Sequence, residues 1–177
     1  MSAKQGNGRD KLNIKRITVY ALISALCLIV GYLETLLSSA VTAAVPGVKL
    51  GLSNAAVLTL VCLGDKKGAW AVNAVRICLS ALLFGSSVSF VMSAAGGAAS
   101  TAAACLLSRI KQVSEIGISI ACGVIHNIFQ IAAAILIVGI GAVYYLPLLT
   151  VAGALCGGFC GVLVKLIIKK IKTNRMF

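Results

Sequence analysis

Acidic residues are scarce in this chain of 177 residues. It has only four Asp and Glu against 16 Lys and Arg, and a single histidine. The two aspartates, Asp10 and Asp65, are far apart, so no acidic cluster is available to hold the Mg²⁺ of a diphosphate substrate. The P-loop pattern GxxxxGK[ST] and the GxSxG nucleophile elbow are also missing, although spacing alone leaves a Ser–His–acid triad open. We therefore expect a protein that is not an enzyme and that carries no cofactor and no metal.

Charge of either sign and proline are also infrequent. Charged residues make up 11% of the chain, proline occurs twice, and 60% of the residues are hydrophobic, with a mean hydropathy of +1.05. A soluble domain has about 45–50% apolar and about 25% charged residues. The apolar runs are long and do not alternate, which favours helices over the closed barrels that are the other membrane-spanning structure. The sequence predicts an all-α, polytopic integral membrane protein.

The hydrophobic runs predict six transmembrane helices. A helix rises about 1.5 Å per residue, so about 20 residues cross the roughly 30 Å of hydrocarbon. The first run is longer than the apolar part of a signal peptide and is expected to remain in the protein. We expect a basic cytoplasmic tail over residues 1–16, a six-helix domain over 17–168 and a second basic tail over 169–177. The predicted spans are Ile17–Ser38, Leu50–Leu63, Ala69–Phe84, Val88–Leu107, Gly117–Ile140 and Leu146–Val164.

Basic residues flank these spans on one side only. Six spans place both termini, and the connections at 64–68 and 108–113, on the same side, which collects fourteen Lys and Arg; the other side has Lys49 alone. The positive-inside rule then puts both termini in the cytoplasm. Their expected partners are anionic lipid headgroups, and no nucleic acid, because no basic face interleaved with aromatic residues occurs.

Small residues indicate where helices pack closely. Gly153, Gly157 and Gly161 form a GxxxGxxxG face on the sixth span, and Gly96 and Gly97 belong to a run of small residues on the fourth. Both features predict packing inside the bundle. Ala21 and Ala25 form an AxxxA face on the first span, which fits either internal packing or a partner protein. The seven cysteines lie in apolar runs without a CxxC pair, and we interpret them as small buried side chains.

Polar side chains at membrane depth are costly and by default mark a function. Among the residues expected at this depth, Lys49 and Arg76 are cations and Glu34 is a carboxylate, which leaves an excess of positive charge. That excess suits an anionic or carboxylated ligand in a cavity open to the outside. The alternative is that Glu34 neutralises Arg76 or Lys49 and that the amides only hold helices together. Ser53 precedes one of these amides at the start of the second span. The candidate substrate-binding residues are Glu34, Lys49, Asn54, Asn73, Arg76, His126, Asn127 and Gln130.

Several of these residues belong to motifs that resemble a known family. In order, the chain shows Glu34-Thr-Leu-Leu, PGVKLGLSN at 46–54, Arg76 with LLFGS at 82–86, SAAGG at 93–97, His126-Asn127 with Gln130, and YYLP at 144–147. This series resembles the Gx transporter family, also labelled heptaprenyl diphosphate synthase component I, which is similar to the substrate-binding S components of energy-coupling factor (ECF) transporters. Ser53 stands where alanine is expected, and no proline follows soon after Glu34.

The resemblance implies a six-helix S-component fold in a bacterial cell membrane. Such a subunit captures a small solute from outside, here a vitamin or an isoprenoid- or quinone-related compound. Ala21 and Ala25 would dock a transmembrane coupling subunit, and two cytoplasmic ATPases would supply the energy. The alternative function is a non-catalytic membrane accessory subunit of heptaprenyl diphosphate synthesis.

Overall fold

The computed structural model describes residues 14, 17–33, 52–84 and 87–174. Every element in these ranges is helical, so the all-α prediction is confirmed for this part of the chain. After a first helix, Ile17–Leu33, come α2 (Asn54–Cys62), α3 (Lys66–Phe84), α4 (Ser87–Leu107), α5 (Glu115–Val138), the 3₁₀ helix η1 (Ile140–Tyr145) and α6 (Leu146–Asn174).

Three of the described helical segments are long and apolar enough to cross a membrane. They are Ser87–Leu107, Glu115–Val138 and Ile140–Ile171, whereas the first helix has a shorter apolar stretch. The chain therefore has the helices of a membrane protein, while the count of six spans stays a prediction. The largest difference is in the second predicted span, because α2 has only nine residues and rises about 14 Å.

Local signals in the sequence explain where several helices begin and end. The Ser114 side chain caps α5 by accepting from the Gly117 backbone N–H at 3.1 Å, with Glu115 in the first turn. At its other end, α5 stops at Gly139, whose φ of 106° lies in the region that favours glycine. Asp65 accepts from the Gly68 backbone N–H at 3.0 Å at the start of α3. These caps fix the turns that bring neighbouring helices antiparallel.

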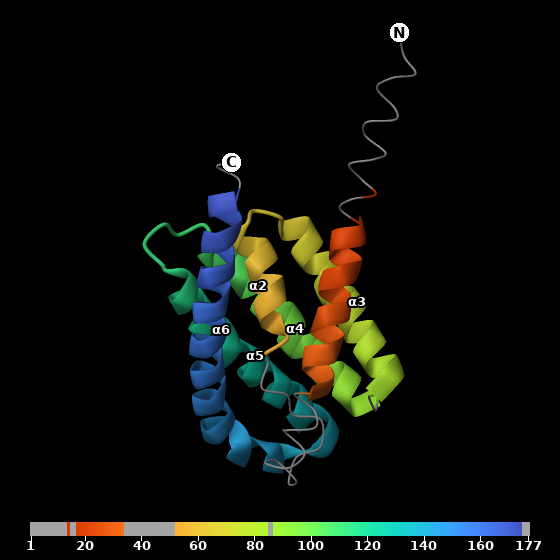
Figure 1. The fold of residues 1–177 in the computed structure, drawn as a ribbon. Coiled ribbons are helices and arrows are strands. Elements are labelled where there is room, and N and C mark those ends of the chain that lie inside the picture. Colours follow the sequence, from red (N-terminus) through yellow and green to blue (C-terminus); the bar gives the residue numbers. More distant parts are fainter. Residues whose placement is uncertain (1–13, 15–16, 34–51, 85–86, 175–177) are drawn as a thin grey trace.

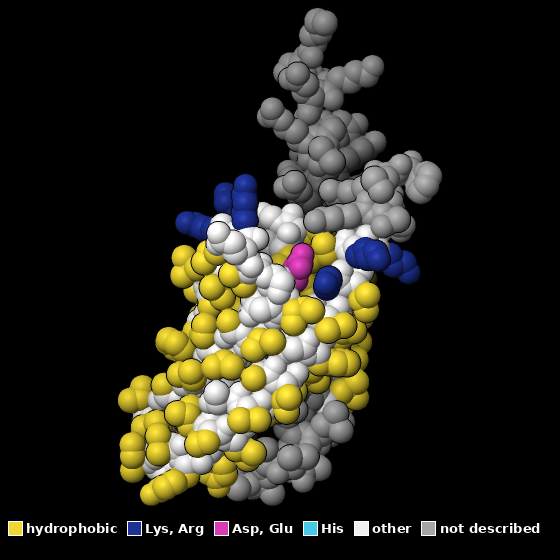
Figure 2. Space-filling model, turned by 90° about the vertical axis from the view of Figure 1, so that its left-hand side faces the viewer, with side chains coloured by type: hydrophobic (Ala, Val, Ile, Leu, Met, Phe, Trp, Pro, Cys, Tyr) yellow, Lys and Arg dark blue, Asp and Glu magenta, His cyan; other side chains and the backbone are white. Residues whose placement is uncertain are grey.

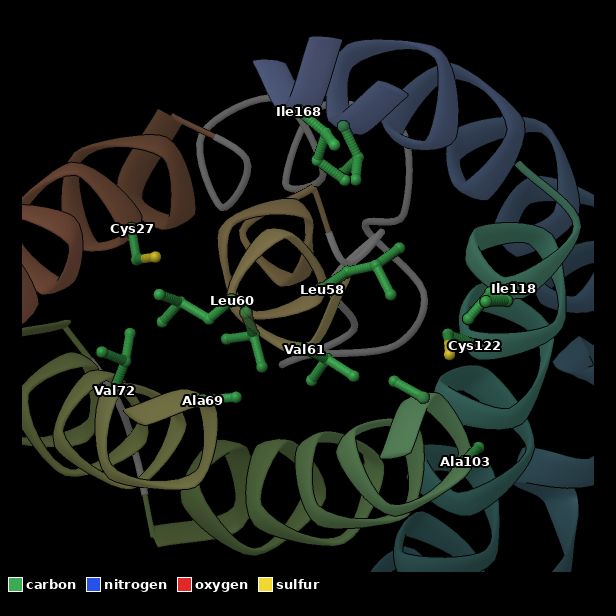
Figure 3. Packing of buried hydrophobic residues seen from close by; sticks show 13 residues of the cluster. Cys27, Leu58, Leu60, Val61, Ala69, Val72, Ala103, Ile118, Cys122 and Ile168 are labelled. Carbon is green, nitrogen blue, oxygen red and sulfur yellow. The ribbon is translucent and has the colours of Figure 1, made fainter. Parts of the chain in front are cut away.

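The short helix α2 occupies the centre of the bundle. Figure 3 shows it surrounded by the first helix, α3, α4, α5 and α6. Its side chains Val57, Leu58, Leu60 and Val61 are almost fully buried and form the middle of the main hydrophobic cluster. In Figure 1, α2 begins about halfway along the bundle, so its N-terminus lies inside the protein.

Positive charge gathers at one end of the bundle. The start of the first helix, the α2–α3 turn, the α4–α5 connection and the end of α6 lie at this end (Figure 1). Figure 2 shows Lys and Arg side chains there, above a flank that is mainly hydrophobic. The exposed basic residues are Lys67, Arg109, Lys111, Lys165, Lys169 and Lys170. We refer to this as the basic end of the bundle.

Candidate functional site

A group of polar side chains lies where α2 begins, in the middle of the helix bundle. It contains Ser53 and Asn54 at the start of α2, Asn73 and Arg76 on α3, and His126 on α5. We call these five residues the polar cluster. All are buried except Asn54, which is partly buried. Residues that are 72 positions apart in the sequence therefore meet at one place.

Arg76 is the charged member of the polar cluster. Only 8% of its surface is exposed. Its Nη2 donates to Oδ1 of Asn54 at 2.9 Å and to Oδ1 of Asn73 at 2.7 Å, and its Nη1 donates to the Ser53 hydroxyl. Each of these acceptors is neutral. Both described carboxylates lie elsewhere: Asp65 precedes α3, eleven residues from Arg76, and Glu115 opens α5.

The N-terminus of α2 adds to the positive potential around Arg76. The first backbone N–H groups of a helix lack internal partners and carry a partial positive charge. Ser53, the residue that precedes α2, uses its hydroxyl for Arg76 and makes no side-chain cap on the helix. A guanidinium and a helix N-terminus thus converge on Ser53 and Asn54. This arrangement is suited to an anion.

His126 connects the polar cluster to α5. Its side chain is 3% exposed, and its Nδ1 lies 3.1 Å from Nδ2 of Asn54. The imidazole ring packs on Gly96 of α4: a Cβ at that position would lie 3.0 Å from both Cε1 and Nδ1 of the ring. The neighbouring Gly97 gives similar room to the Asn73 amide, whose atoms would lie 3.2–3.3 Å from a Cβ. Two adjacent glycines on α4 therefore provide the surface against which the cluster rests.

The other candidate residues are arranged differently. Asn127 is fully buried, and its Nδ2 donates to the Leu149 carbonyl of α6 at 2.5 Å, so it links α5 to α6 rather than to Arg76. Gln130 is fully buried one turn further along α5. Glu34 and Lys49 lie outside the described residues. Ala21 and Ala25 are exposed on the first helix.

Sequence reasoning left out three residues of this site. Ser53 was expected to be polar at depth but was not counted among the candidates, and it receives a hydrogen bond from Arg76. Gly96 and Gly97 were predicted to pack helices in general, whereas here they face His126 and Asn73. Their adjacency within SAAGG was the available signal, because two neighbouring glycines make room on two helix faces.

A small cavity reaches the edge of the polar cluster at Asn54. It lies between α2, α5 and α6 and is also bordered by Gly123, Gly157 and Cys160. Its volume of about 20 Å³ has room for about one water molecule. Pockets for solutes usually enclose about 300–1,000 Å³. This cavity by itself is therefore too small for a solute.

Comparison with known families identifies the group to which this chain belongs. The family model described as heptaprenyl diphosphate synthase component I matches residues 23–167, a stretch that contains the whole polar cluster. Curated proteins and solved structures give no match. From the first-helix residues through most of α6, the match covers well over half of the sequence. The chain belongs to the heptaprenyl diphosphate synthase component I family.

Proposed function

We propose that this protein is a membrane-embedded, solute-binding subunit of an ECF-type importer, and that its polar cluster holds the anionic group of a small solute from outside. The solute class is a vitamin or an isoprenoid- or quinone-related compound. The observation that carries the proposal is Arg76, a buried cation that donates to the neutral oxygens of Ser53, Asn54 and Asn73. A cation at membrane depth is costly and is retained for a function.

An anionic oxygen would bind Arg76 more strongly than the hydroxyl and amide oxygens of Ser53, Asn54 and Asn73 do. A hydrogen bond between two charged groups is roughly twice as strong as one between neutral groups. A carboxylate or phosphate at Arg76 would exchange hydroxyl and amide oxygens for charged ones and would also lie at the N-terminus of α2.

The remaining parts of the importer would be separate chains. The sequence contains no P-loop, so the energy would come from two cytoplasmic ATPases joined through a transmembrane coupling subunit. Ala21 and Ala25, exposed on the first helix, are the proposed contact with that subunit. The basic end of the bundle is proposed to face the cytoplasm and the anionic lipids of the inner surface. Both termini would then lie on the cytoplasmic side of a bacterial cell membrane.

A binding measurement on the full chain in lipid nanodiscs tests the proposal. The probes are biotin and pantothenate as carboxylates, and inorganic diphosphate and geranyl diphosphate as phosphates. We expect at least one probe to raise the thermal stability of the wild type and to bind at least about tenfold more weakly to Arg76→Gln. Lys165→Gln, which removes an exposed cation from α6, is the matched control and should bind as the wild type does.

Two results would overturn the proposal. One is that none of the four probes stabilises or binds the wild type. The other is that Arg76→Gln and Lys165→Gln bind equally well. The variant Glu34→Gln examines the alternative in which Glu34 neutralises Arg76. Under that alternative, the variant is less stable than the wild type and no probe binds. Under the binding proposal, at least one probe still binds to the variant.

The family description favours a second candidate function. A component I implies a further component, so the chain would be a non-catalytic membrane subunit of heptaprenyl diphosphate synthesis. The scarcity of aspartate agrees with a subunit that does not itself hold Mg²⁺-diphosphate. Purification from native membranes with mass spectrometry separates the candidates. A soluble prenyl synthase among the partners supports the accessory role, and a coupling subunit with two ATPases supports the importer.

A further inference from the structure

The Asn54 amide lies between the only described charge of the polar cluster and the single histidine of the chain. Its Oδ1 accepts from Nη2 of Arg76 at 2.9 Å, and its Nδ2 lies 3.1 Å from Nδ1 of His126. A guanidinium has donors and no acceptor, so the amide must turn its oxygen towards Arg76. Its NH₂ group then faces His126 and donates to Nδ1. Nδ1 is therefore an acceptor without a proton, and the proton of the neutral ring is on Nε2.

The position of the imidazole is fixed by α4 as well as by Asn54. The ring lies so close to Gly96 that an added Cβ would be 3.0 Å from Nδ1. The backbone carbonyl of His126 would be even closer to that Cβ, at 2.8 Å. Small movements of α5 relative to α4 are therefore restricted. A change in the protonation of Nδ1 therefore acts directly on the Asn54 amide, 3.1 Å away.

We propose that His126 is a proton-binding site linked through Asn54 to the anion site at Arg76, so that an anion and a proton are bound together. This inference rests on the proposed anion site. An imidazolium has an N–H at both nitrogens and would meet the Asn54 NH₂ as one donor meets another. The amide can accept from it only by turning over, which would place its NH₂ against Arg76. That turn removes the Asn54 oxygen to which Arg76 donates, and an incoming anion supplies a charged oxygen in its place.

Charge balance acts in the same direction. A proton on His126 adds a positive charge near Arg76, and an anion bound at Arg76 attracts that charge in the low-dielectric interior. The proton comes from water and goes to Nδ1, and no covalent bond other than this N–H forms or breaks. Each anion bound at Arg76 is therefore accompanied by uptake of up to one proton.

No other described charge is placed to take over this role at His126. On α5 the only charged residue is Glu115, eleven positions before His126, and the other titratable group is Cys122. Of the helices packed against α5, α2 and α4 carry Cys62 and Cys105 and no charge, and η1 carries Tyr144 and Tyr145. On α6 the described groups are Cys156, Cys160 and the lysines from Lys165 onwards, near the basic end. Arg76 of α3 is the cation that reaches His126 through Asn54.

The proton position can be measured directly because the chain has one histidine. Nitrogen-15 NMR of the histidine-labelled full chain in nanodiscs at neutral pH gives one pair of ring signals. We expect Nδ1 to be unprotonated and Nε2 to carry the proton. In Asn54→Asp the carboxylate can only accept, so Nδ1 should become protonated. Asn73→Leu removes a different acceptor of Arg76 without adding an anion and should leave Nδ1 unprotonated. A protonated Nδ1 in the wild type would overturn the linkage.

Proton uptake is measured by calorimetry of geranyl diphosphate and pantothenate binding in buffers of different ionisation enthalpy. We expect between about half and one proton to be taken up per anion near neutral pH, and none in His126→Gln when it still binds. Binding to the wild type without uptake overturns the proton site and leaves the proposed function standing. Absence of binding by every probe overturns the proposed function, and the wild-type NMR signals still decide whether Asn54 donates to His126.

Discussion

Two of the contacts that α5 makes in the bundle are built in opposite ways. Towards α6, glycines let the two backbones touch: a Cβ on Gly123 would overlap the Gly153 carbonyl oxygen, and one on Gly157 would lie 2.7 Å from the Ser119 carbonyl oxygen. Towards α2, the contact runs through His126 and Asn54, and Asn54 in turn accepts from Arg76 of α3. We call the first the glycine interface, and it also includes Gly161, beside Ile116.

The difference shows which contact can move. Lipid gives no hydrophobic driving force between helices, so close backbone contact through small residues is a main source of their association. Such a contact has one good geometry and resists sliding. A hydrogen-bonded contact of amides, a hydroxyl and a guanidinium can exchange partners at small cost when a better acceptor arrives. We infer that α5 and α6 form the rigid part of the bundle and that the polar cluster is the part that opens.

The largest expected effect is from Gly123→Ala in the glycine interface. The new methyl group would overlap the backbone of α6, and backbone cannot rotate away as a side chain can. We expect a loss of about 3 kcal/mol or more in the free energy of unfolding, at the upper end for overpacked sites. Thermal and denaturant unfolding in detergent micelles measure it.

Gly158→Ala is the matched control for that variant. It lies in α6, but its Cβ would be 3.8 Å from Ile120, an ordinary contact. It should leave stability unchanged or raise it by up to about 1 kcal/mol, because alanine favours helix more than glycine does. Equal losses in the two variants would contradict the view that backbone contact makes α5–α6 rigid.

The next effect distinguishes a functional polar cluster from a structural one. Arg76→Met leaves the acceptors on Ser53, Asn54 and Asn73 without their donor, which should cost about 1–3 kcal/mol. Adding Ser53→Ala and Asn73→Leu removes two of those acceptors. Since apolar replacement of a whole buried polar group is often neutral or stabilising, we expect the triple variant to recover to within about 1 kcal/mol of the wild type.

The triple variant should nevertheless bind none of the anionic probes. Recovered stability with lost binding would show that the cluster is kept for its ligand. A triple variant less stable than Arg76→Met would instead show that these side chains mainly hold α2 to α3. Unfolding and binding measured on the same nanodisc samples give both quantities.

The sequence predicted the helices better than the way in which they meet. Hydrophobic runs indicated five segments that correspond to the first helix and to α3–α6, with ends within a few residues for α4 and α5. The start of α2 could not be read in this way, because Leu50 and Leu52 are as apolar as the helix that follows, and no side-chain cap marks where that helix begins. Asn54, Asn73, Arg76 and His126 were predicted to meet, and the structure joins them by hydrogen bonds.

Other parts of the site depended on which face of a helix meets which neighbour. Asn127 follows His126 directly, so helical periodicity turns it about 100° away, towards α6 and Leu149. Grouping it with His126 by sequence proximity did not reveal that. Gly96 and Gly97 show the same limit: their small size predicted close packing, but the polar side chains that fill the space come from α3 and α5.

A smaller effect is expected from substituting the two glycines of α4. One of them lies against backbone and the other against flexible side chains, so their costs should differ. Gly96→Ala would meet the backbone of His126 at 2.8 Å, so it should cost about 1–3 kcal/mol and displace the imidazole. Gly97→Ala would meet the flexible end of Ile77 at 2.8 Å and the Asn73 amide, which can shift. We expect it to cost less than about 1 kcal/mol while weakening probe binding through Asn73. If Gly97→Ala were the more destabilising variant, backbone contact would not be the deciding factor.

The smallest effect tests a polar contact that lies away from the interior of the bundle. The Tyr20 hydroxyl of the first helix donates to Asp65, which also accepts from Gly68 at the start of α3. Tyr20→Phe removes this one bond at a partly buried site, so we expect a loss of about 0.5 kcal/mol in the free energy of unfolding, the lower end for one hydrogen bond. Tyr144→Phe, at a side chain that is 84% exposed, is the control and should change nothing. Water near the basic end can replace the lost hydroxyl, so the loss should be small. If Tyr20→Phe lost as much stability as Arg76→Met, depth in the bundle would not set the cost of breaking a polar contact.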